Sequence, residues 1–322
     1  MKAIVRSEYG SSGCLRFEEV EPPTVGSGEV LVKVRASSVN PYDWHMVRGE
    51  PYLIRMSDGL RHPKSQGVGI DVAGTVAALG EGVTSFEIGD EVFGVGVGTL
   101  AEFALANADR LAKKPASISF EAAAAMPCAA ATALVGLRER GELKAGQRIL
   151  INGAAGGVGT FAVQIAKSMG ATVTGVCSTR NVDLVRSIGA DDVTDYTKED
   201  FSRLDQKFDV VMDTVGNRSL TALRRALTKD GTLLLVAGTK GKWFRPLALM
   251  LKGVVVSKFV HHRILVVMGG AKHEELVALA ELVDAGALTP VIDRTYSLSE
   301  SAQALEYLYE GHARGKVVVE VA

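Results

Sequence analysis

Cysteine is scarce in this chain, and neither sign of charge is in excess. The three cysteines, Cys14, Cys128 and Cys177, lie far apart and are odd in number, which argues against a disulfide framework and against a zinc site of the CxxC type. The 36 Lys and Arg residues balance 37 Asp and Glu, and no basic block supplies the stripe that a nucleic-acid-binding protein needs. We therefore expect a cytoplasmic protein whose partners do not include nucleic acid.

Long apolar runs are also missing, and the first residues of the sequence do not predict a secretion signal. The N-terminal MKAIVRSEYG contains no apolar core and no small-residue cleavage site. The most apolar stretch, residues 243–270, is interrupted by Arg245, Lys252, Lys258 and Arg263, well before the ~20 apolar residues that a spanning helix requires. This stretch leaves three interpretations open: a subunit interface, a lid over a bound molecule, or a weak peripheral contact with a membrane.

The 322 residues and the apolar content of 47% suit two domains, each with its own core. Up to about residue 115 the sequence consists of short alternating runs, such as EVLVKVRASSVN and DVAGTVAALG, which are separated by Gly, Pro, Asp and Ser. Alternation with a period of two and frequent turns predict an antiparallel, barrel-like β domain.

From Ser119 onward, strand-like and helix-like segments alternate. The apolar runs RILIN, TVTGVC, DVVMDTV and TLLLVAG are strand-length, and their alternation with helical segments predicts a parallel sheet with covering helices. The tail returns to strand-like sequence in TPVIDRTYSL and KVVVEVA, and we expect it to rejoin the first domain. The predicted first domain therefore comprises residues 1–118 and 289–322, and the second domain comprises residues 119–288.

A glycine-rich turn follows the first strand of this alternation. Residues 149–151 form the apolar strand, Gly153–Gly159 the turn, and Thr160–Met169 an amphipathic helix, so the spacing A-x-G-x-x-G stands where a dinucleotide fingerprint belongs. Because Gly156 and Gly159 have no side chains, the backbone can approach a pyrophosphate, whose charge would rest on the N–H groups at the helix start. Many such turns carry glycines for packing alone, but the flanking elements favour a dinucleotide.

The second parallel strand, TVTGVC, ends where an NAD-binding site shows an Asp or Glu for the ribose hydroxyl. This chain has Ser178, Thr179 and Arg180 there, and these donors with a positive charge suit a 2′-phosphate. We therefore predict NADPH rather than NADH as the cofactor. The alternative is that Arg180 is only a surface charge near the start of the next helix.

Several motifs, in their order along the chain, resemble the medium-chain dehydrogenase/reductase superfamily. They are GVTSFEIGDEVFG, AAAMPCAAATAL, NGAAGGVGTFAVQIAKSMGA, GADDVTDY and the closing GKVVV. The resemblance covers the whole chain and is strongest to the zinc-free quinone oxidoreductase group. It implies an α/β fold with a GroES-like β-barrel domain and a Rossmann NADP-binding domain, which is a doubly wound parallel sheet. It also implies a homodimer joined through the sheet edges of the Rossmann domains.

The resemblance indicates where zinc-dependent members of the superfamily hold their catalytic metal. The corresponding positions look like Asn40, Ile70 and Cys128, and only the cysteine of these three is a zinc ligand. Because a catalytic zinc site needs three protein ligands, we predict that this chain binds no metal. Cys128 is then expected to pack as a small hydrophobic residue.

The same resemblance implies cofactor contacts in both domains, several of them at the carboxyl ends of parallel strands, where ligands bind in open α/β sheets. Small residues at strand ends are also common in ordinary turns, and Tyr196 could be an ordinary half-buried aromatic residue. Together with the phosphate-binding residues above, the predicted cofactor-binding residues are Asn40, Thr132, Ala155, Gly156, Gly157, Val158, Ser178, Thr179, Arg180, Tyr196, Val215, Gly216, Ala237 and Gly238.

The candidate catalytic residues lie in NPYDWHMVRGEPY and are Tyr52, Asn40 and His45. Tyr52 comes first, because enoyl-thioester reductases of the superfamily place a proton-donating Tyr after a Gly that resembles Gly49, although the spacing here is one residue longer. His45 can donate a proton near neutral pH, or it can simply be packed. Asp43 is expected to organise the local backbone.

Without a metal, hydride transfer depends on orienting the nicotinamide against an electrophilic carbon and on donors to the developing oxyanion. Quinones and α,β-unsaturated carbonyls spread the incoming charge, so weak donors suffice where a simple ketone benefits from a Lewis acid. We therefore predict a zinc-independent, NADPH-dependent oxidoreductase that reduces a small electrophile of one of these two kinds.

Three alternatives to this function remain open. Two are related enzymes, an enoyl-thioester reductase and a zinc-free enzyme similar to alcohol dehydrogenases. The third belongs to another class: a non-catalytic protein that binds NADPH and has a structural role, because a fold by itself does not fix an activity.

Overall fold

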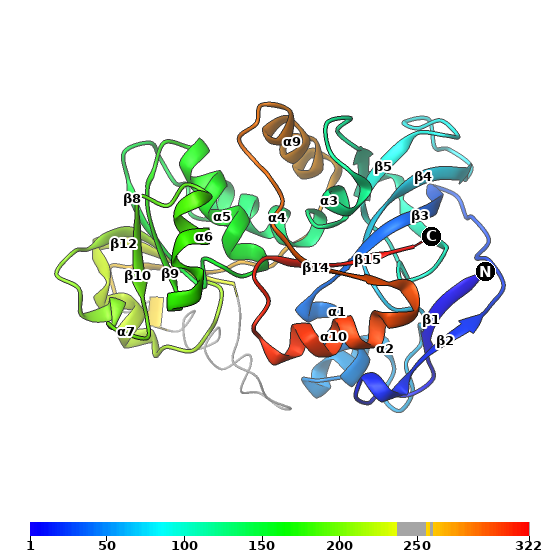
Figure 1. Ribbon diagram of the computed structural model, residues 1–322, viewed down its shortest axis with the longest axis horizontal. Helices are drawn as coiled ribbons and strands as arrows, with labels where there is room; N and C mark the ends of the chain where they lie inside the picture. Colours follow the sequence, from blue (N-terminus) through cyan, green and yellow to red (C-terminus); the bar gives the residue numbers. More distant parts are fainter. Residues whose placement is uncertain (237–255, 258–259, 322) are drawn as a thin grey trace. The chain divides into compact units, whose positions relative to one another are not determined.

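The computed structural model of the chain describes residues 1–236, 256–257 and 260–321 (Figure 1). Its contacts divide the chain into two compact units. The first comprises Met1–Ala131, Gly270–Gly286 and Pro290–Ala322, and the second comprises Thr132–Gly269 and Ala287–Thr289. Each unit contains a sheet and a hydrophobic core of its own.

The first unit is built around a mostly antiparallel seven-stranded sheet and a separate two-stranded hairpin. In β3 the valines at every second position, Val30, Val32 and Val34, are buried, because alternate side chains of a strand point to the same face. The strands are β1 (Lys2–Arg6), β2 (Leu15–Glu19), β3 (Glu29–Val39), β4 (Asp71–Leu79), β5 (Glu91–Val95), β6 (Phe103–Asn107), β7 (Leu111–Lys113), β14 (Ile292–Ser297) and β15 (Lys316–Glu320).

The C-terminal strands lie in the sheet of the first unit. The strand order is β14-β15-β3-β4-β5-β7, and β6 also pairs with β3. β15 is antiparallel to β3, with Val317 opposite Val39, and β3 is antiparallel to β4, with Ser38 opposite Asp71. The start of β15, the end of β3 and the start of β4 therefore meet at the same end of three neighbouring strands.

The boundaries between the two units differ from the expected domain boundaries because of two helices. α3 (Phe120–Ala124) contacts β3 and β4, and α9 (His273–Asp284) contacts β5 and β7. Residues 119–131 and 270–286 were expected in the second domain, but they belong to the first unit because these helices pack on its sheet. The other helical segments here are α1 (Pro41–Arg48), α2 (Arg55–Asp58), α10 (Ser301–Glu310) and the 3₁₀ turns η1 (Ser12–Cys14), η2 (Tyr52–Ile54), η3 (Ala108–Arg110) and η7 (Leu298–Glu300).

The second unit contains a wholly parallel six-stranded sheet in the order β10-β9-β8-β11-β12-β13. The chain runs outward from β8 on one side and from β11 on the other, which is the doubly wound order of a Rossmann fold. The predicted α/β fold class is confirmed. The strands are β8 (Arg148–Asn152), β9 (Thr172–Cys177), β10 (Asp192–Asp195), β11 (Phe208–Asp213), β12 (Leu227–Leu235) and β13 (Arg263–Val266).

Helices cover this parallel sheet, so the middle residues of its central strands are apolar. Ile149, Leu150 and Ile151 of β8 are all fully buried, as a parallel strand between two helical layers requires. The covering helices are α5 (Gly157–Ser168), α6 (Val182–Ser187) and α7 (Leu220–Arg225), with the 3₁₀ turns η5 (Thr179–Asn181) and η6 (Phe201–Arg203). α4 (Pro127–Leu134) continues into a π-helical turn, η4 (Val135–Arg140).

Most of the stretch 243–270 lies outside the described residues. The three interpretations of that stretch, as interface, lid or membrane contact, therefore stay predictions. Within the described part of the chain, no helix combines the length and the apolar character needed to cross a bilayer.

Candidate active site

The glycine turn lies between β8 and α5, at the point where the strand order of the parallel sheet reverses. Gly153 has a positive φ of 87°, which costs a glycine nothing. A Cβ added at Gly159 would lie 2.0 Å from the carbonyl oxygen of Gly153, so only glycine allows the helix to start this close to the strand. The turn therefore has the close backbone approach that the fingerprint predicts.

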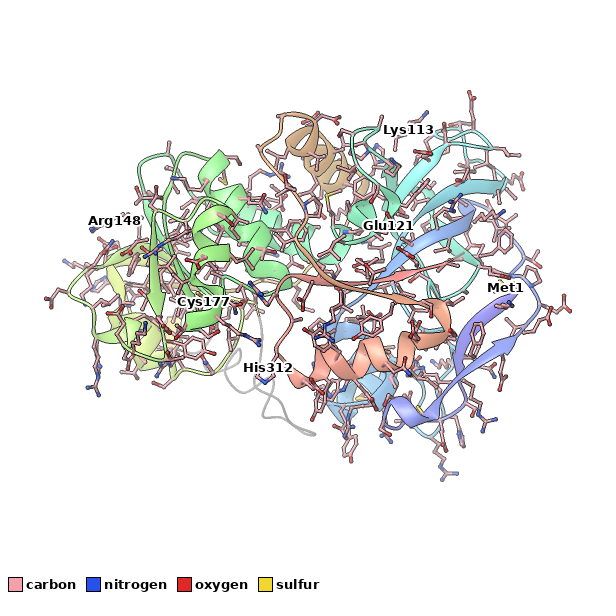
Figure 2. All side chains as sticks on the ribbon, in the orientation of Figure 1. Met1, Lys113, Glu121, Arg148, Cys177 and His312 are labelled. Carbon is pink, nitrogen blue, oxygen red and sulfur yellow. The ribbon has the colours of Figure 1, made fainter. Side chains whose placement is uncertain are left out.

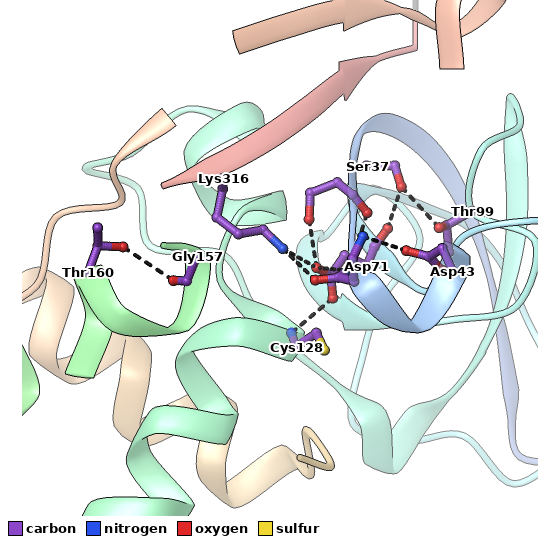
Figure 3. A network of polar contacts seen from close by, with 10 residues as sticks. Ser37, Asp43, Asp71, Thr99, Cys128, Gly157, Thr160 and Lys316 are labelled. Carbon is purple, nitrogen blue, oxygen red and sulfur yellow. Dashed lines mark hydrogen bonds and ion pairs between the residues drawn. The ribbon is translucent and has the colours of Figure 1, made fainter. Parts of the chain in front are cut away.

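The start of α5 is open to an anion. Gly156 is the N-cap residue and, as a glycine, has no side chain that could cap the first N–H groups of the helix. Thr160 donates its hydroxyl to the carbonyl oxygen of Gly157, at 3.2 Å (Figure 3). The first N–H groups of a helix have no partner within the helix and carry the positive end of its dipole. These features, with the space left by the glycines, fit the pyrophosphate of a dinucleotide.

The ends of β9 and β10 bring the predicted 2′-phosphate residues together. The register pairs Asp195 with Cys177, so Tyr196 follows one strand where Ser178 follows the other. Figure 2 marks this end of β9 with Cys177. Tyr196 is 50% exposed, and its N–H donates to the carbonyl oxygen of Cys177 at 3.0 Å. Ser178, Thr179 and Tyr196 therefore form one surface at the carboxyl end of the sheet.

The carboxylate of Asp195 also lies at this surface, but it is held by its neighbours. The hydroxyl of Thr179 donates to Asp195 Oδ2 at 2.6 Å, and the hydroxyl of Thr197 donates to Oδ1 at 2.7 Å. The bond from Thr179, followed by those from Thr197, lowers the pKa of Asp195 to about 2. Lys198 Nζ lies 3.5 Å from the same carboxylate and offsets its charge.

The ends of β8 and β11 are joined by Asp213, a residue that the sequence pattern did not single out. Asp213 Oδ1 accepts the side-chain amide of Asn152 at 2.8 Å and the N–H groups of Val215 and Gly216, each at 3.2 Å. Burial raises the pKa of Asp213, and its Oδ2 is buried with no hydrogen-bond partner among the described residues. Asp213 thus fixes the turn that contains Val215 and Gly216. The side chain of Val215 is 40% exposed.

The remaining predicted cofactor residues are placed as follows. Ala155, Gly157 and Val158 belong to the turn and the first residues of α5, and Thr132 is buried in α4. Ala237 and Gly238 lie outside the described residues.

In the first unit, Asp71 is the centre of a buried polar cluster (Figure 3). Asp71 Oδ2 accepts from the hydroxyl of Ser38 at 2.6 Å, from Asn40 Nδ2 at 2.9 Å and from Lys316 Nζ at 3.3 Å. Asp71 Oδ1 accepts from the N–H of Cys128 at 2.9 Å. We call these five residues the Asp71 cluster. Its members come from β3, β4, α4 and β15, and from the residue that joins β3 to α1.

Asp43 adds a second carboxyl group beside the Asp71 cluster. Its Oδ2 accepts the N–H of Asn40 at 2.7 Å and so fixes the start of α1, which is the backbone role expected for it. Burial, followed by the negative charge of Asp71, raises the pKa of Asp43 to about 7. The positive charge of Lys316, which bonds Asp71, acts on Asp43 in the opposite direction and lowers its pKa in part.

The two predicted proton donors make contacts in the segment after Asn40. His45 Nδ1 lies 2.7 Å from the carbonyl oxygen of Glu50. Because a carbonyl oxygen only accepts, Nδ1 carries the proton of the neutral ring and Nε2 is an acceptor. Burial lowers the pKa of His45, which disfavours proton donation at neutral pH. Tyr52, in η2, packs under the guanidinium group of Arg55, 4.7 Å from the ring centroid.

The donors of the Asp71 cluster do not suit a zinc ion. Of its five residues, only Asp71 and Cys128 carry groups that commonly bind zinc, whereas a catalytic zinc site needs three protein ligands. Burial, followed by the charge of Asp71, raises the pKa of the Cys128 thiol to about 12. Asp71 already receives four hydrogen bonds, one of them from an ammonium group. Among the described residues, no group of three or more His, Cys, Asp or Glu side chains could hold a metal ion.

Comparison with known proteins identifies the family. The model of the alcohol dehydrogenase GroES-like domain matches residues 26–116, and that of a zinc-binding dehydrogenase matches residues 188–319. The mouse mitochondrial NAD(P)H oxidoreductase RTN4IP1 is 36% identical over 356 residues, which cover 100% of this chain and 89% of that protein. The chloroplastic NADPH-dependent alkenal/one oxidoreductase of Arabidopsis thaliana is 34% identical over 334 residues, covering 99% and 79%.

Among solved structures, the quinone oxidoreductase from Coxiella burnetii superimposes with a TM-score of 0.88 at 31% identity, covering 100% of this chain and 99% of that one. A parallel sheet with a glycine turn at its switch point, on one chain with a GroES-like domain, defines an NAD(P)H-dependent oxidoreductase. The chain belongs to the medium-chain dehydrogenase/reductase superfamily and, within it, to the quinone oxidoreductase-like group.

Proposed function

We propose that this protein uses NADPH to reduce quinones or α,β-unsaturated carbonyl compounds without zinc. The observation that carries the choice of cofactor is the surface at the ends of β9 and β10. There Ser178, Thr179 and Arg180 follow β9, and Tyr196 follows the neighbouring β10, in place of the acid that binds the ribose of NAD. The name of the alkenal/one oxidoreductase, NADPH-dependent, supports the same choice.

Each part of the cofactor would be held by residues already described. The N–H groups at the start of α5 would bind the pyrophosphate, and Ser178, Arg180 and Tyr196 would bind the 2′-phosphate. Val215 and Gly216, in the turn shaped by Asp213, would lie along the nicotinamide ribose, and Asn40 would contact the nicotinamide. Bound NADPH supplies a hydride, and the role of these residues is to fix where that hydride is presented.

The proposed acceptors follow from the groups that could stabilise the product. A simple ketone yields a localised alkoxide, which a zinc ion stabilises in metal-dependent dehydrogenases. The Asp71 cluster does not suit zinc, because it offers one thiol and one carboxylate where three protein ligands are needed, and that carboxylate is bound by Lys316. A quinone or an enone delocalises the incoming charge, so such an acceptor needs weaker donors. The names of the related quinone and alkenal/one oxidoreductases agree with this proposal.

A fluorescence titration tests the proposal first. The purified protein, in EDTA, is titrated with NADPH and separately with NADH, and a panel of quinones and enones is then screened for NADPH oxidation. We expect much tighter binding of NADPH than of NADH and turnover with at least one acceptor class. Equal binding of the two cofactors would refute the 2′-phosphate site, and absence of binding would refute the oxidoreductase assignment.

The compartment and the assembly state remain predictions. The two relatives described above are named as mitochondrial and chloroplastic, so they do not support the predicted cytoplasmic location. The homodimer expected from the resemblance is checked by light scattering on the purified protein.

A further inference from the structure

We propose that Lys316 is a positioning residue, whose ammonium group fixes the side-chain amide of Asn40 in one orientation for hydride transfer. The proposal rests on the function proposed above, because it assigns Lys316 a part in that reaction. It concerns a residue at the far end of the chain, 276 positions from Asn40, that the sequence pattern did not mark as functional.

The topology of the first sheet places the three groups together. Lys316 is the first residue of β15, and Asn40 directly follows β3. Because Val317 lies opposite Val39 in the antiparallel register, Lys316 comes opposite Asn40. Asp71 is the first residue of β4 on the other side of β3, opposite Ser38. The chain therefore presents an ammonium group on one side of Asn40 and a carboxylate on the other.

The hydrogen bonds leave the amide of Asn40 a single orientation. Lys316 Nζ donates to Asn40 Oδ1 at 2.5 Å, and Asn40 Nδ2 donates to Asp71 Oδ2 at 2.9 Å. A flipped amide would set its NH₂ group against the ammonium, which has no acceptor, and its oxygen against the carboxylate, which has no donor. Hydrogen bonds to charged groups are stronger than neutral ones, so the two contacts together oppose the flip.

Burial makes this arrangement rigid but gives it little value for stability alone. Lys316 is 3% exposed, and Asp71 and Asn40 are also buried. A buried ion pair brings little net stability, because removing two charges from water offsets their attraction. What the Lys316–Asp71 pair does specifically is to orient the side-chain amide of Asn40. The proposed function places this amide at the nicotinamide.

The test compares Lys316→Met with a matched control, Lys114→Met. Lys114 is also a lysine of the first unit, with a side chain only 5% exposed, whose Nζ lies 3.2 Å from Glu91 and donates to the carbonyl oxygens of Pro115 and Ile118. For Lys316→Met we expect kcat for NADPH oxidation to fall about ten- to a hundredfold, the loss typical of a misplaced reacting group. The Kd for NADPH, set mainly by the phosphates, should change less than about threefold. Lys114→Met should keep the wild-type kcat.

A double-mutant cycle separates positioning from a merely structural effect. If Lys316 acts through Asn40, the variant Asn40→Ala/Lys316→Met should lose no more activity than Asn40→Ala alone. Lys316→Arg, which keeps a positive donor, should recover part of the loss. Additive losses in the cycle, or the same kcat for Lys316→Met and Lys114→Met, would overturn the inference while leaving the proposed function intact.

A measurement without cofactor covers the case in which the wild type shows no turnover. In spectra of ¹⁵N-labelled protein, the side-chain amide signal of Asn40 is the one lost in Asn40→Ala. We expect that signal to shift, and its protons to exchange with water at least about tenfold faster, in Lys316→Met but not in Lys114→Met. An unchanged signal would overturn the inference. Wild-type protein that binds neither NADPH nor NADH would refute the proposed function separately.

Unfolding of Lys316→Met, which leaves Asp71 buried without its cation, is a foreseeable outcome. The variant Asp71→Asn/Lys316→Met removes both charges and restores neutrality. Its thermal unfolding should approach that of the wild type, but its kcat should stay low because the ammonium group that holds the side-chain oxygen of Asn40 is gone. Wild-type kcat in this double variant would contradict a positioning role for Lys316.

Discussion

Arg180 contributes a positive charge beside Ser178, where β9 ends next to Tyr196. We expect Arg180→Gln to weaken NADPH binding about ten- to a hundredfold, because a hydrogen bond to a charged group contributes about 1.5–3 kcal/mol. NADH, which has no 2′-phosphate, should bind as it does to the wild type. Fluorescence titration with both cofactors measures the difference. Arg186→Gln, which removes an exposed arginine of α6, is the control and should leave both affinities unchanged.

Asp43 makes stability depend on pH in a predictable direction. Its pKa is about 7 in the folded protein and about 3.9 in an unfolded chain, so the folded state holds the proton more tightly. Its stabilising contribution is complete below about pH 4 and is lost as the pH rises to about 7. The free energy of unfolding of the wild type should therefore fall, relative to that of Asp43→Asn, by up to about 4 kcal/mol across this range.

Urea unfolding of both proteins at several pH values measures this difference, and other titrating groups cancel in the comparison. The carboxamide oxygen that Asp43→Asn introduces can still accept the N–H of Asn40, so the start of α1 should persist in the variant. A difference that stays constant between pH 4 and pH 7, or that grows with pH, would contradict the raised pKa of Asp43.

At the residue scale, the sequence points to Asn40 but not to its partners. Asp71 and Lys316 are each the first residue of an apolar strand, so the sequence does indicate a charge at the end of each of these buried segments. They lie 245 positions apart, however, and only the order of the strands in the sheet makes them neighbours. The proton donors His45 and Tyr52 remain predictions, and the bond from His45 Nδ1 to Glu50 depends on a backbone turn that residue types do not reveal.

At the scale of elements, two glycines of the turn between β8 and α5 have different expected roles. Gly159 is needed for packing, whereas Gly156 is needed for cofactor binding. Gly159→Ala would force a Cβ to within 2.0 Å of the Gly153 carbonyl oxygen, so we expect it to destabilise the protein by more than about 2 kcal/mol. In Gly156→Ala the nearest atom would lie at 3.4 Å and φ is −86°, so the fold should tolerate alanine.

The added methyl group at position 156 would still lie where the backbone must approach the pyrophosphate. We therefore expect Gly156→Ala to keep its melting temperature but to bind NADPH at least about tenfold more weakly, a loss of about 1.4 kcal/mol. Thermal unfolding and fluorescence titration of the two variants measure both effects. Unchanged NADPH affinity in Gly156→Ala would mean that this glycine serves packing alone.

The elements themselves differ in how far the sequence predicts them. Apolar strands alternating with helices predict the parallel sheet, which the order β10-β9-β8-β11-β12-β13 confirms. The place of α9 was not predictable in the same way. Its buried residues Leu276, Leu279 and Val283 form an apolar face that would suit either sheet, and periodicity does not say which sheet a helix covers.

At the scale of the whole molecule, the chain leaves the first unit and returns to it. β14 and β15 follow the parallel sheet in sequence but pair beside β3, and this return carries Lys316 to Asn40. The strand-like tail in the sequence predicts this return to the first unit. That Lys316 then lies beside Asn40 follows only from the register of β15 with β3. Truncation at the C-terminus should therefore affect the Asp71 cluster as well as the sheet.

Removal of metal tests the chemistry of the molecule as a whole. Dialysis against EDTA should leave thermal unfolding and the rate of NADPH oxidation unchanged, because the positive charge at Asp71 is the ammonium group of Lys316 and the Asp71 cluster offers fewer than the three protein ligands that a catalytic zinc site needs. Elemental analysis before dialysis should find far less than one zinc ion per chain. A stoichiometric zinc ion, whose removal abolished turnover and whose return restored it, would show that residues other than the Asp71 cluster hold a catalytic metal.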